Sequence, residues 1–341
     1  MGLVTSFAGL VTVRFLLGLM EGPMFPGIVL YLSGFYTRED LSLRVALFFS
    51  SASLSGAFSG LLAAAIENMN GVGGKPGWAW IFILEGIFSV LIGILGFFVI
   101  PSSLQDSNLL SPKHKDILEQ RRKRDRPSLS VDDRFSFKEV LRSAKSLHVA
   151  IIFISFFFLG TTLFGLALFL PTIVGELGFS PNRTHLLSVG PFATAFAGYA
   201  IYLTSTDKHV TYGALYLIVP GVYAVAPILA AWMANNSEPH YRRASSVAFG
   251  FMAANCGGIL STWSFPSNEA PRYTKTTIMN LTFSAIIVVA SMANVLILDL
   301  KNKRKVQKRA DILAPYGDDA QSNETAWKEL GDRHPDFCYT L

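Results

Sequence analysis

The sequence contains few residues that can carry covalent or metal chemistry. Its two cysteines, Cys256 and Cys338, form neither a disulfide framework nor a metal-binding pattern, and its six histidines do not cluster. No nucleophile, base and orienting residue stand at a recognisable spacing, and no phosphate-binding loop is present. The sequence therefore predicts that the protein is not an enzyme and has no catalytic residue. It also predicts no metal and no cofactor.

Charge is also scarce. Only 16% of the 341 residues are charged, whereas 51% are hydrophobic and the mean hydropathy is +0.40. This composition excludes an ordinary soluble protein and indicates a chain that crosses a lipid bilayer several times. The net charge of +5 does not indicate nucleic-acid binding, because the basic residues lie in loops between apolar runs.

We expect an all-α membrane protein, because backbone groups in hydrocarbon must satisfy their hydrogen bonds within a helix. A crossing helix needs about 20 apolar residues, and about eight segments reach or approach this length. They are Phe7–Tyr36, Ala46–Ile66, Trp78–Ile100, Val149–Leu170, Leu186–Leu203, Tyr212–Ala234, Ser246–Phe265 and Ile278–Leu298.

Two basic segments predict the orientation, because cytoplasmic loops carry an excess of lysine and arginine. One is the loop 101–147, and the other is the tail 301–341, which opens with KNKRKVQKR. The expected units are a partial N-terminal helix bundle (1–100), a cytoplasmic connecting loop (101–147), a C-terminal helix bundle (148–300) and a cytoplasmic tail (301–341).

Within these polar segments, Ser111 and Pro112 predict the start of a helix, as its N-cap and first residue. The basic run Arg121–Arg126 suits a solvated connector that follows the charge rule, or a site for anionic lipid. The polar tail after Arg309 is expected to be poorly ordered.

The charge pattern conflicts with the number of crossings at one place. The loop Pro171–His185 should lie outside and Asn235–Ala244 inside, which requires an odd number of crossings, but two apolar segments lie between them. Either Leu186–Leu203 enters the membrane without crossing, or sequence is missing near Phe192–Tyr199. We expect the deletion, and Met1 likewise stands inside an apolar run, as if earlier spans were missing.

The first apolar segment carries an arginine and a glutamate two helical turns apart. Arg14 and Glu21 therefore fall on roughly the same face of a helix, and intramembrane charges of this kind mark functional sites by default. The planar donor fork of Arg14 suits an organic carboxylate, and desolvation would make Glu21 a group that takes up a proton. The alternative is a structural ion pair between helices.

Three other polar groups lie within the apolar segments and are weaker candidates. Glu85 is a second candidate for proton coupling, with a clamp to the backbone as its alternative. Asn255 and Tyr31 are candidate substrate contacts, and the alternative for each is helix packing.

The segment around Arg14 resembles the fourth helix of the major facilitator superfamily, and within it the fungal allantoate-permease-like organic anion:proton symporters. The pattern R-x-x-x-G-x-x-E-G-x-x-x-P is formed by Arg14, Gly18, Glu21, Gly22 and Pro26. Other stretches resemble the sixth, tenth and eleventh helices and the tail of this family, namely Gly77–Gly86, Pro220–Ala244, Asn255–Tyr273 and Gly331–Leu341.

This resemblance implies proton-coupled uptake of a small organic anion, such as a vitamin-type carboxylate. It assigns the carboxylate contact to Arg14 and proton linkage to Glu21. It further implies a monomer in the plasma membrane.

The chain departs from the family's twelve-helix pattern. It resembles helices four to seven and ten to twelve, so the expected fold is an incomplete major facilitator fold with two unequal helix bundles. The alternative function is a non-transporting fragment or a regulatory relative from an incomplete gene model, because alternating access needs two complete halves.

Overall fold

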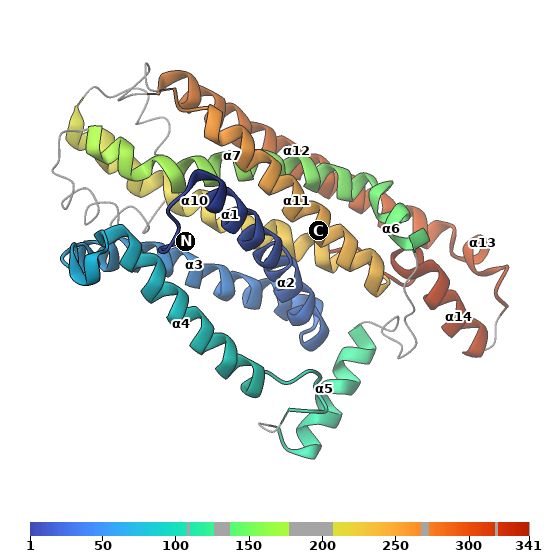
Figure 1. Ribbon diagram of the computed structural model, residues 1–341. Coiled ribbons are helices and arrows are strands. Elements are labelled where there is room, and N and C mark those ends of the chain that lie inside the picture. Colours follow the sequence, from blue (N-terminus) through green and yellow to red (C-terminus); the bar gives the residue numbers. More distant parts are fainter. Residues whose placement is uncertain (108–109, 126–136, 177–206, 267–272, 318–319, 341) are drawn as a thin grey trace.

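The computed structural model describes the chain except for residues 108–109, 126–136, 177–206, 267–272, 318–319 and 341. All regular structure in the described part is helical (Figure 1). Five helical stretches there are long and apolar enough to cross a membrane: Phe7–Phe35, Gly77–Val99, Leu147–Gly165, His240–Trp263 and Thr274–Gln307. The prediction of an all-α membrane protein is therefore confirmed.

The first apolar segment is divided into two helices. Helix α1 (Phe7–Glu21) begins at Ser6, whose hydroxyl accepts a hydrogen bond from the Gly9 amide at 3.1 Å. Helix α2 (Met24–Phe35) follows Pro23, which lacks the amide hydrogen that a continuous helix would need. The break comes directly after Glu21, where the sequence has glycine followed by proline.

The other predicted spans correspond to helices, except Leu186–Leu203, which falls outside the described residues together with the expected deletion near Phe192–Tyr199. Four of these helices contain the whole predicted span and extend beyond it, namely α3 (Arg38–Glu67), α7 (Leu147–Glu176), α10 (Lys208–Asn235) and α12 (Thr274–Gln307). The other two end before the predicted span does: α4 (Gly77–Val99) ends before Ile100, and α11 (His240–Trp263) ends before Ser264.

Helices α7 and α11 pack closely, and glycine makes this possible. A methyl group on Gly257 would collide with the Phe157 carbonyl, and one on Gly160 would collide with the backbone of Ala254. Helix α7 also contacts α12 through polar groups: the Thr162 hydroxyl lies 3.3 Å from Asn280 Oδ1. Small residues and hydrogen bonds of this kind hold helices together where burial from water contributes little.

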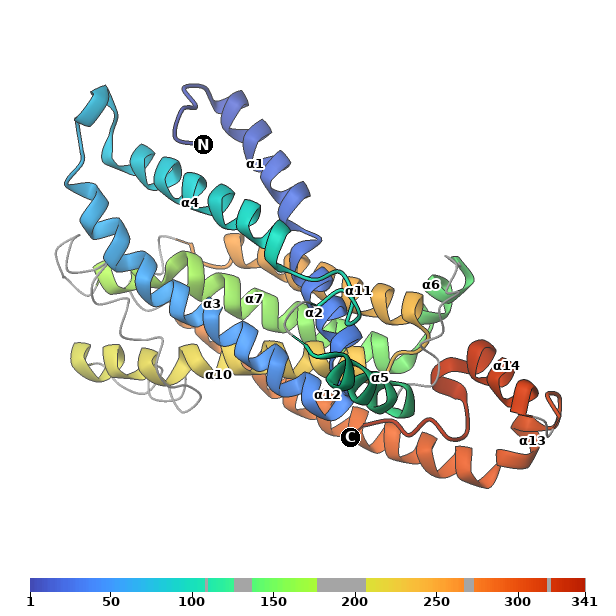
Figure 2. The ribbon, with the colours of Figure 1, turned by 90° about the horizontal axis from the view of Figure 1, so that it is seen from below.

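Phenylalanines join the two halves of the chain in one core. The ring of Phe251 on α11 lies 6.0 Å from Phe25 of α2, 6.5 Å from Phe49 of α3 and 5.5 Å from Phe156 of α7. Helices α1 and α4 stand away from this core (Figure 2). Helix α1 contains no buried residue, and the buried residues of α4 are Gly77 and Ala79 at its start.

The polar segments gather at one end of the bundle. We call this the basic end, which consists of the described residues of 101–147 and 301–340. It includes α5 (Pro112–Asp125), α6 (Phe137–Ala144), α13 (Arg309–Leu313), α14 (Ala320–Leu330) and a 3-10 turn, η4 (Gly331–Arg333). Helix α5 begins where the sequence predicts, and the Ser111 hydroxyl accepts from the His114 amide at 3.4 Å.

The expectation of a poorly ordered tail is wrong for residues 331–340. The Tyr339 backbone forms two hydrogen bonds with the Asn302 side chain, at 2.9 and 3.0 Å. The Thr340 amide donates to Asn236 Oδ1 at 2.8 Å, and the Thr340 carbonyl accepts from Trp232 Nε1 at 2.9 Å. The tail is held because side chains of α10, α12 and the loop after α10 satisfy its backbone.

Candidate functional site

Arg14 lies on α1 and faces the start of α4. It lines a cavity of ≈ 390 Å³ together with Trp78 and Phe82 of α4 and the first residues of the chain. Its side chain is exposed, and within the described part of the protein its guanidinium forms no hydrogen bond or ion pair. The cavity therefore combines an aromatic wall with a cation whose charge is not matched there.

Glu21 is the last residue of α1 and is exposed. Among the described contacts, its carboxylate is paired neither with Arg14 nor with any other cation. The structural ion pair that the sequence left open as an alternative is thus not formed in this arrangement of the helices.

The remaining predicted site residues lie on other helices. The Tyr31 hydroxyl on α2 donates to the Pro101 carbonyl at 2.8 Å. Glu85 is exposed on α4, and Asn255 is exposed on α11, where its side chain donates to the Phe251 carbonyl of its own helix at 2.9 Å. Among the described contacts, no hydrogen bond or ion pair joins any two of the five predicted site residues.

A second polar group of residues lies buried at the basic end, and sequence reasoning missed it. Arg243 of α11 pairs with Glu238 at 2.7 Å, and both side chains are only 1% exposed. Arg243 also donates to the Ser33 hydroxyl of α2 at 3.1 Å. This arginine thus connects α11 to α2, two helices that lie far apart in the sequence.

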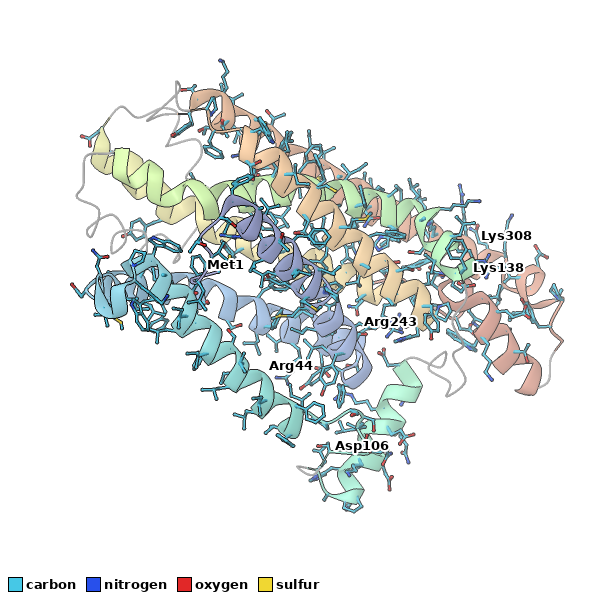
Figure 3. The ribbon with its side chains drawn as sticks, in the orientation of Figure 1. Met1, Arg44, Asp106, Lys138, Arg243 and Lys308 are labelled. Carbon is cyan, nitrogen blue, oxygen red and sulfur yellow. The ribbon has the colours of Figure 1, made fainter. Side chains whose placement is uncertain are left out.

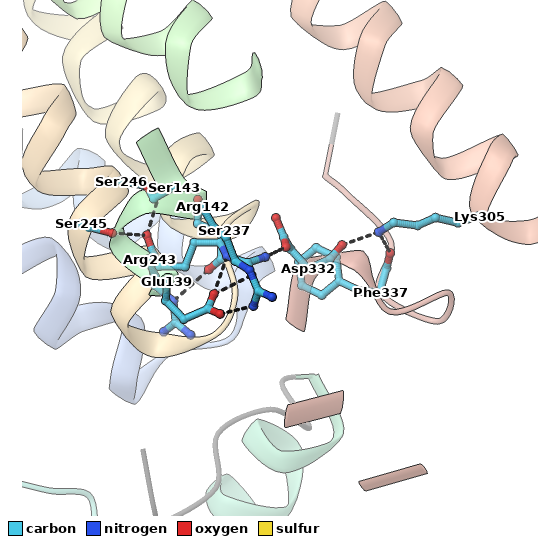
Figure 4. A network of polar contacts seen from close by, with 11 residues as sticks. Glu139, Arg142, Ser143, Ser237, Arg243, Ser245, Ser246, Lys305, Asp332 and Phe337 are labelled. Carbon is cyan, nitrogen blue, oxygen red and sulfur yellow. Dashed lines mark hydrogen bonds and ion pairs between the residues drawn. The ribbon is translucent and has the colours of Figure 1, made fainter. Parts of the chain in front are cut away.

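The neighbouring Arg242 binds two carboxylates. Its Nε donates to Glu139 of α6 at 3.0 Å, and its Nη1 forms an ion pair with Asp332 of η4. Lys305 of α12 donates to the Asp332 carbonyl at 2.5 Å and to the Phe337 carbonyl at 2.8 Å (Figure 4). This network fixes α6, α11, α12 and the tail to one another.

Burial changes the ionisation of two groups in the tail. It raises the pKa of Asp332 to about 6, and the Arg242 guanidinium opposes this rise. Burial lowers the pKa of His334, whose ring stacks on Trp327 with a centroid distance of 3.9 Å. Both effects favour the neutral form of the side chain.

Helix α3 is attached at the same end of the bundle. The Asn235 side chain of α10 donates to the Arg38 carbonyl at 2.9 Å, and Arg38 Nη1 donates to the Cys338 carbonyl of the tail at 2.9 Å. The Arg38 guanidinium also lies 4.7 Å from the centre of the Phe337 ring. The tail thus contacts both halves of the chain.

Arg242 and Arg243 belong to Asn235–Ala244, which the charge pattern placed on the inside as a loop. The sequence gives only a weak indication that the two arginines are buried. Glu238 precedes Arg243 by five residues, but Asp332, Glu139 and Ser33 stand about 90 to 210 positions away from the arginines that they contact. Such contacts depend on the fold and have no local pattern.

Comparison with known proteins decides the family. The family model described as Major Facilitator Superfamily matches residues 1–294. The chain belongs to the major facilitator superfamily. The predicted resemblance is thereby confirmed, and with it an incomplete all-α major facilitator fold, an integral membrane location and a transporter rather than an enzyme.

The relatives are fungal transporters. A transporter of Schizosaccharomyces pombe is 30% identical over 340 residues, which cover 91% of this chain and 67% of the relative. The high-affinity nicotinic acid transporter of Saccharomyces cerevisiae is 27% identical over 98% of this chain and 67% of its own length. The major facilitator-type transporter hxnP of Emericella nidulans is 26% identical over 98% of this chain and 73% of its own length. This chain thus spans about two thirds of the length of these relatives.

Proposed function

We propose that this major facilitator chain serves the proton-coupled uptake of a small organic anion, with Arg14 as the carboxylate contact. The observation that carries the proposal is an arginine in an apolar helix, facing a cavity, with no partner among the described residues. A charged side chain at the centre of a membrane helix costs about 2.5–3.5 kcal/mol on insertion scales. A bound carboxylate offsets part of that cost through two parallel hydrogen bonds to the guanidinium.

The cavity suits an acid with a flat ring. Trp78 and Phe82 line it beside Arg14, and their rings lie 6.3 Å apart in an edge-to-face arrangement. An aromatic wall next to a cation fits a pyridine or similar carboxylate, because the ring packs on the aromatic faces while the carboxylate meets the guanidinium. One relative is named for nicotinic acid transport, which agrees with this substrate class.

The proton is assigned to carboxylates of the same two helices. Glu21 is the proposed coupling group and Glu85 a second one, since both lie in apolar helices without a described cation beside them. Asn255 and Tyr31 complete the proposed substrate contacts from α11 and α2. This role requires helices α1 and α11 to approach each other more closely than in the present arrangement.

The proposed location is the plasma membrane, with the basic end in the cytoplasm and one copy of the chain as the working unit. Uptake of radiolabelled nicotinate into yeast cells that lack their own carrier tests the proposal. Cells expressing the chain should accumulate label faster at pH 5 than at pH 7.5, and Arg14→Gln should reduce uptake at least tenfold. Arg44→Gln, which changes another exposed arginine by the same charge, should leave uptake unchanged.

The competing function is that of a non-transporting relative. It is favoured by the position of α1 and α4, which stand clear of the core and leave the Arg14 cavity open at the side of the bundle. The same assay separates the two proposals. If the chain reaches the plasma membrane at normal abundance and no labelled carboxylate enters at either pH, the non-transporting function holds.

A further inference from the structure

Helix α6 directly precedes a candidate membrane span. It ends at Ala144, and only Lys145 and Ser146 separate it from Leu147, the first residue of the candidate span Leu147–Gly165. The three Cα–Cα steps from Ala144 to Leu147 cannot carry the chain more than about 11 Å. The end of α6 therefore lies close to the first residue of this span.

One face of α6 is fixed against the protein. The Ser143 and Ser246 hydroxyls are 2.7 Å apart and both buried, and Glu139 receives the guanidinium of Arg242 at 3.0 Å. Arg142 pairs with the same glutamate. These contacts use the acidic residue of the helix and prevent α6 from rotating about its own axis.

The opposite face of α6 is apolar and basic. Phe137 is 70% exposed and Leu141 is 48% exposed, one turn apart on the same side. Lys138 on α6 and Lys145 directly after it are exposed, and Figure 3 shows Lys138 beside α6. Within the described residues neither ammonium has a hydrogen-bonding or ionic partner. The acidic residue of α6 points inward, so no negative side chain of this helix neutralises the two lysines.

We infer that this outer face of α6 is a docking surface for anionic phospholipid. Phe137 and Leu141 enter the boundary between headgroups and acyl chains, and Lys138 and Lys145 contact the lipid phosphates and carboxylates. Charge complementarity and the position before α7 select this occupant, because an exposed aromatic side chain, an aliphatic side chain and two ammoniums without a partner among the described residues, one on α6 and one directly after it, match the two layers of a membrane surface. This surface is separate from the basic run Arg121–Arg126.

The depth of Leu141 tests the docking directly. The full-length chain with Cys256→Ser, Cys338→Ser and Leu141→Cys is spin-labelled in vesicles of phosphatidylcholine with 30 mol% phosphatidylserine. We expect the label to be reached more readily by oxygen than by a water-soluble nickel chelate. A label at Lys328→Cys, on the exposed face of α14, is the control and should show the opposite preference. A Leu141 label as accessible to nickel as the control would assign this face to water or to a soluble partner and overturn the inference.

The charge preference is tested with Lys138→Gln/Lys145→Gln. The protein is equilibrated in mixed micelles of phosphatidylcholine and phosphatidylserine, and the lipid that remains bound after purification is measured. The wild type should retain phosphatidylserine in preference to phosphatidylcholine. In the double variant this preference should be weaker by a factor on the order of ten, because each lysine near an anionic surface strengthens binding several-fold. Lys113→Gln/Lys328→Gln, with the same change in charge at exposed positions of α5 and α14, should retain it. Equal retention by both double variants would contradict the role of α6.

Discussion

The Arg243 guanidinium is fully buried, and among the described residues its charge is balanced by Glu238 and the polar oxygens around it. A buried ion pair contributes little when it is compared with a well-packed apolar pair, but the loss of one partner leaves an uncompensated charge in the interior. Replacing either residue alone should therefore lower the stability of the fold far more than replacing both residues together.

We expect Arg243→Gln and Glu238→Gln each to reduce the free energy of unfolding by about 3–5 kcal/mol, and the double variant to lose less than the sum. Thermal unfolding in detergent, followed by circular dichroism, measures this double-mutant cycle. Lys303→Gln breaks the exposed ion pair with Asp299 and serves as the control, which should not change stability measurably. Strict additivity of the two buried substitutions would show that the pair is not coupled.

His334 should make the docking of the tail depend on pH. Because burial lowers its pKa, the undocked tail binds a proton more readily than the docked one, so docking weakens as the pH falls below about 6.5. Arg309 and Lys305 oppose protonation in the docked state, and Asp336 favours it. Asp332, with its raised pKa, has the opposite trend below about pH 6.

Comparison of the wild type with His334→Gln isolates the histidine from Asp332. We expect amide exchange of residues 331–340, corrected for the intrinsic effect of pH, to accelerate more in the wild type than in the variant between pH 7.5 and 5.5. Parallel pH profiles for the two proteins would exclude His334 as the titrating group.

At the scale of the helices, the sequence predicted the helices that the hydrocarbon of the membrane requires. The apolar run Ile278–Leu298 lies within α12, and Trp78–Ile100 matches α4 except for its last residue, because backbone in hydrocarbon has no alternative to a helix. Gly22 and Pro23 account for the break between α1 and α2, which were predicted as one segment. The order of the tail could not be predicted, because its backbone is held by side chains such as Asn302 and Asn236, which stand 37 and 104 residues away from their partners.

The sequence likewise predicted one part of the candidate polar sites, Arg14 and Glu21, and missed the buried network at the basic end. The chemistry of Arg14 and Glu21 follows from charge inside an apolar run, which is a local property. The network around Arg242 and Arg243 depends on which helices meet at the basic end, and basic residues beside a span are expected whether they are solvated or buried.

The contact between α7 and α11 should not tolerate a side chain at Gly257. The methyl group of Gly257→Ala would overlap the Phe157 carbonyl and the backbone and hydroxyl of Thr161. We expect a loss of about 1–3 kcal/mol in the free energy of unfolding, measured by thermal denaturation in detergent. Gly213→Ala, in α10, is the matched control, since no atom lies within 4 Å of the added methyl group. Similar stability of both variants would mean that α7 and α11 are not in close contact.

Across the described part of the molecule, the polar contacts between helices of residues 1–100 and the rest of the chain gather at the basic end. Arg243 reaches Ser33, Asn235 reaches the Arg38 carbonyl, and Arg38 reaches the tail. Rocking of two bundles about a central site, as in alternating access, separates their ends in turn. The present structure is closed at the basic end, and opening there requires these bonds to break and the tail to release α3.

The orientation of the whole chain can be measured with its own cysteine. In Cys256→Ser, the exposed Cys338 remains as the reactive thiol of the tail. We expect a membrane-impermeant maleimide to label it in sealed right-side-out vesicles only after permeabilisation, because the basic end should face the cytoplasm. Val72→Cys, in a cysteine-free background, should be labelled without permeabilisation, since Val72 is 50% exposed at the opposite end of α3. Labelling of Cys338 in intact vesicles would invert the topology.

The docked tail also has a practical consequence for anyone who expresses this protein. Trp232 and Asn236 hold Thr340 through hydrogen bonds, so a fluorescent reporter or purification tag joined close after it would disturb the docking of the tail on α10. Fusions at that terminus need a long, flexible spacer, and a rigid one should yield less material that survives extraction into detergent.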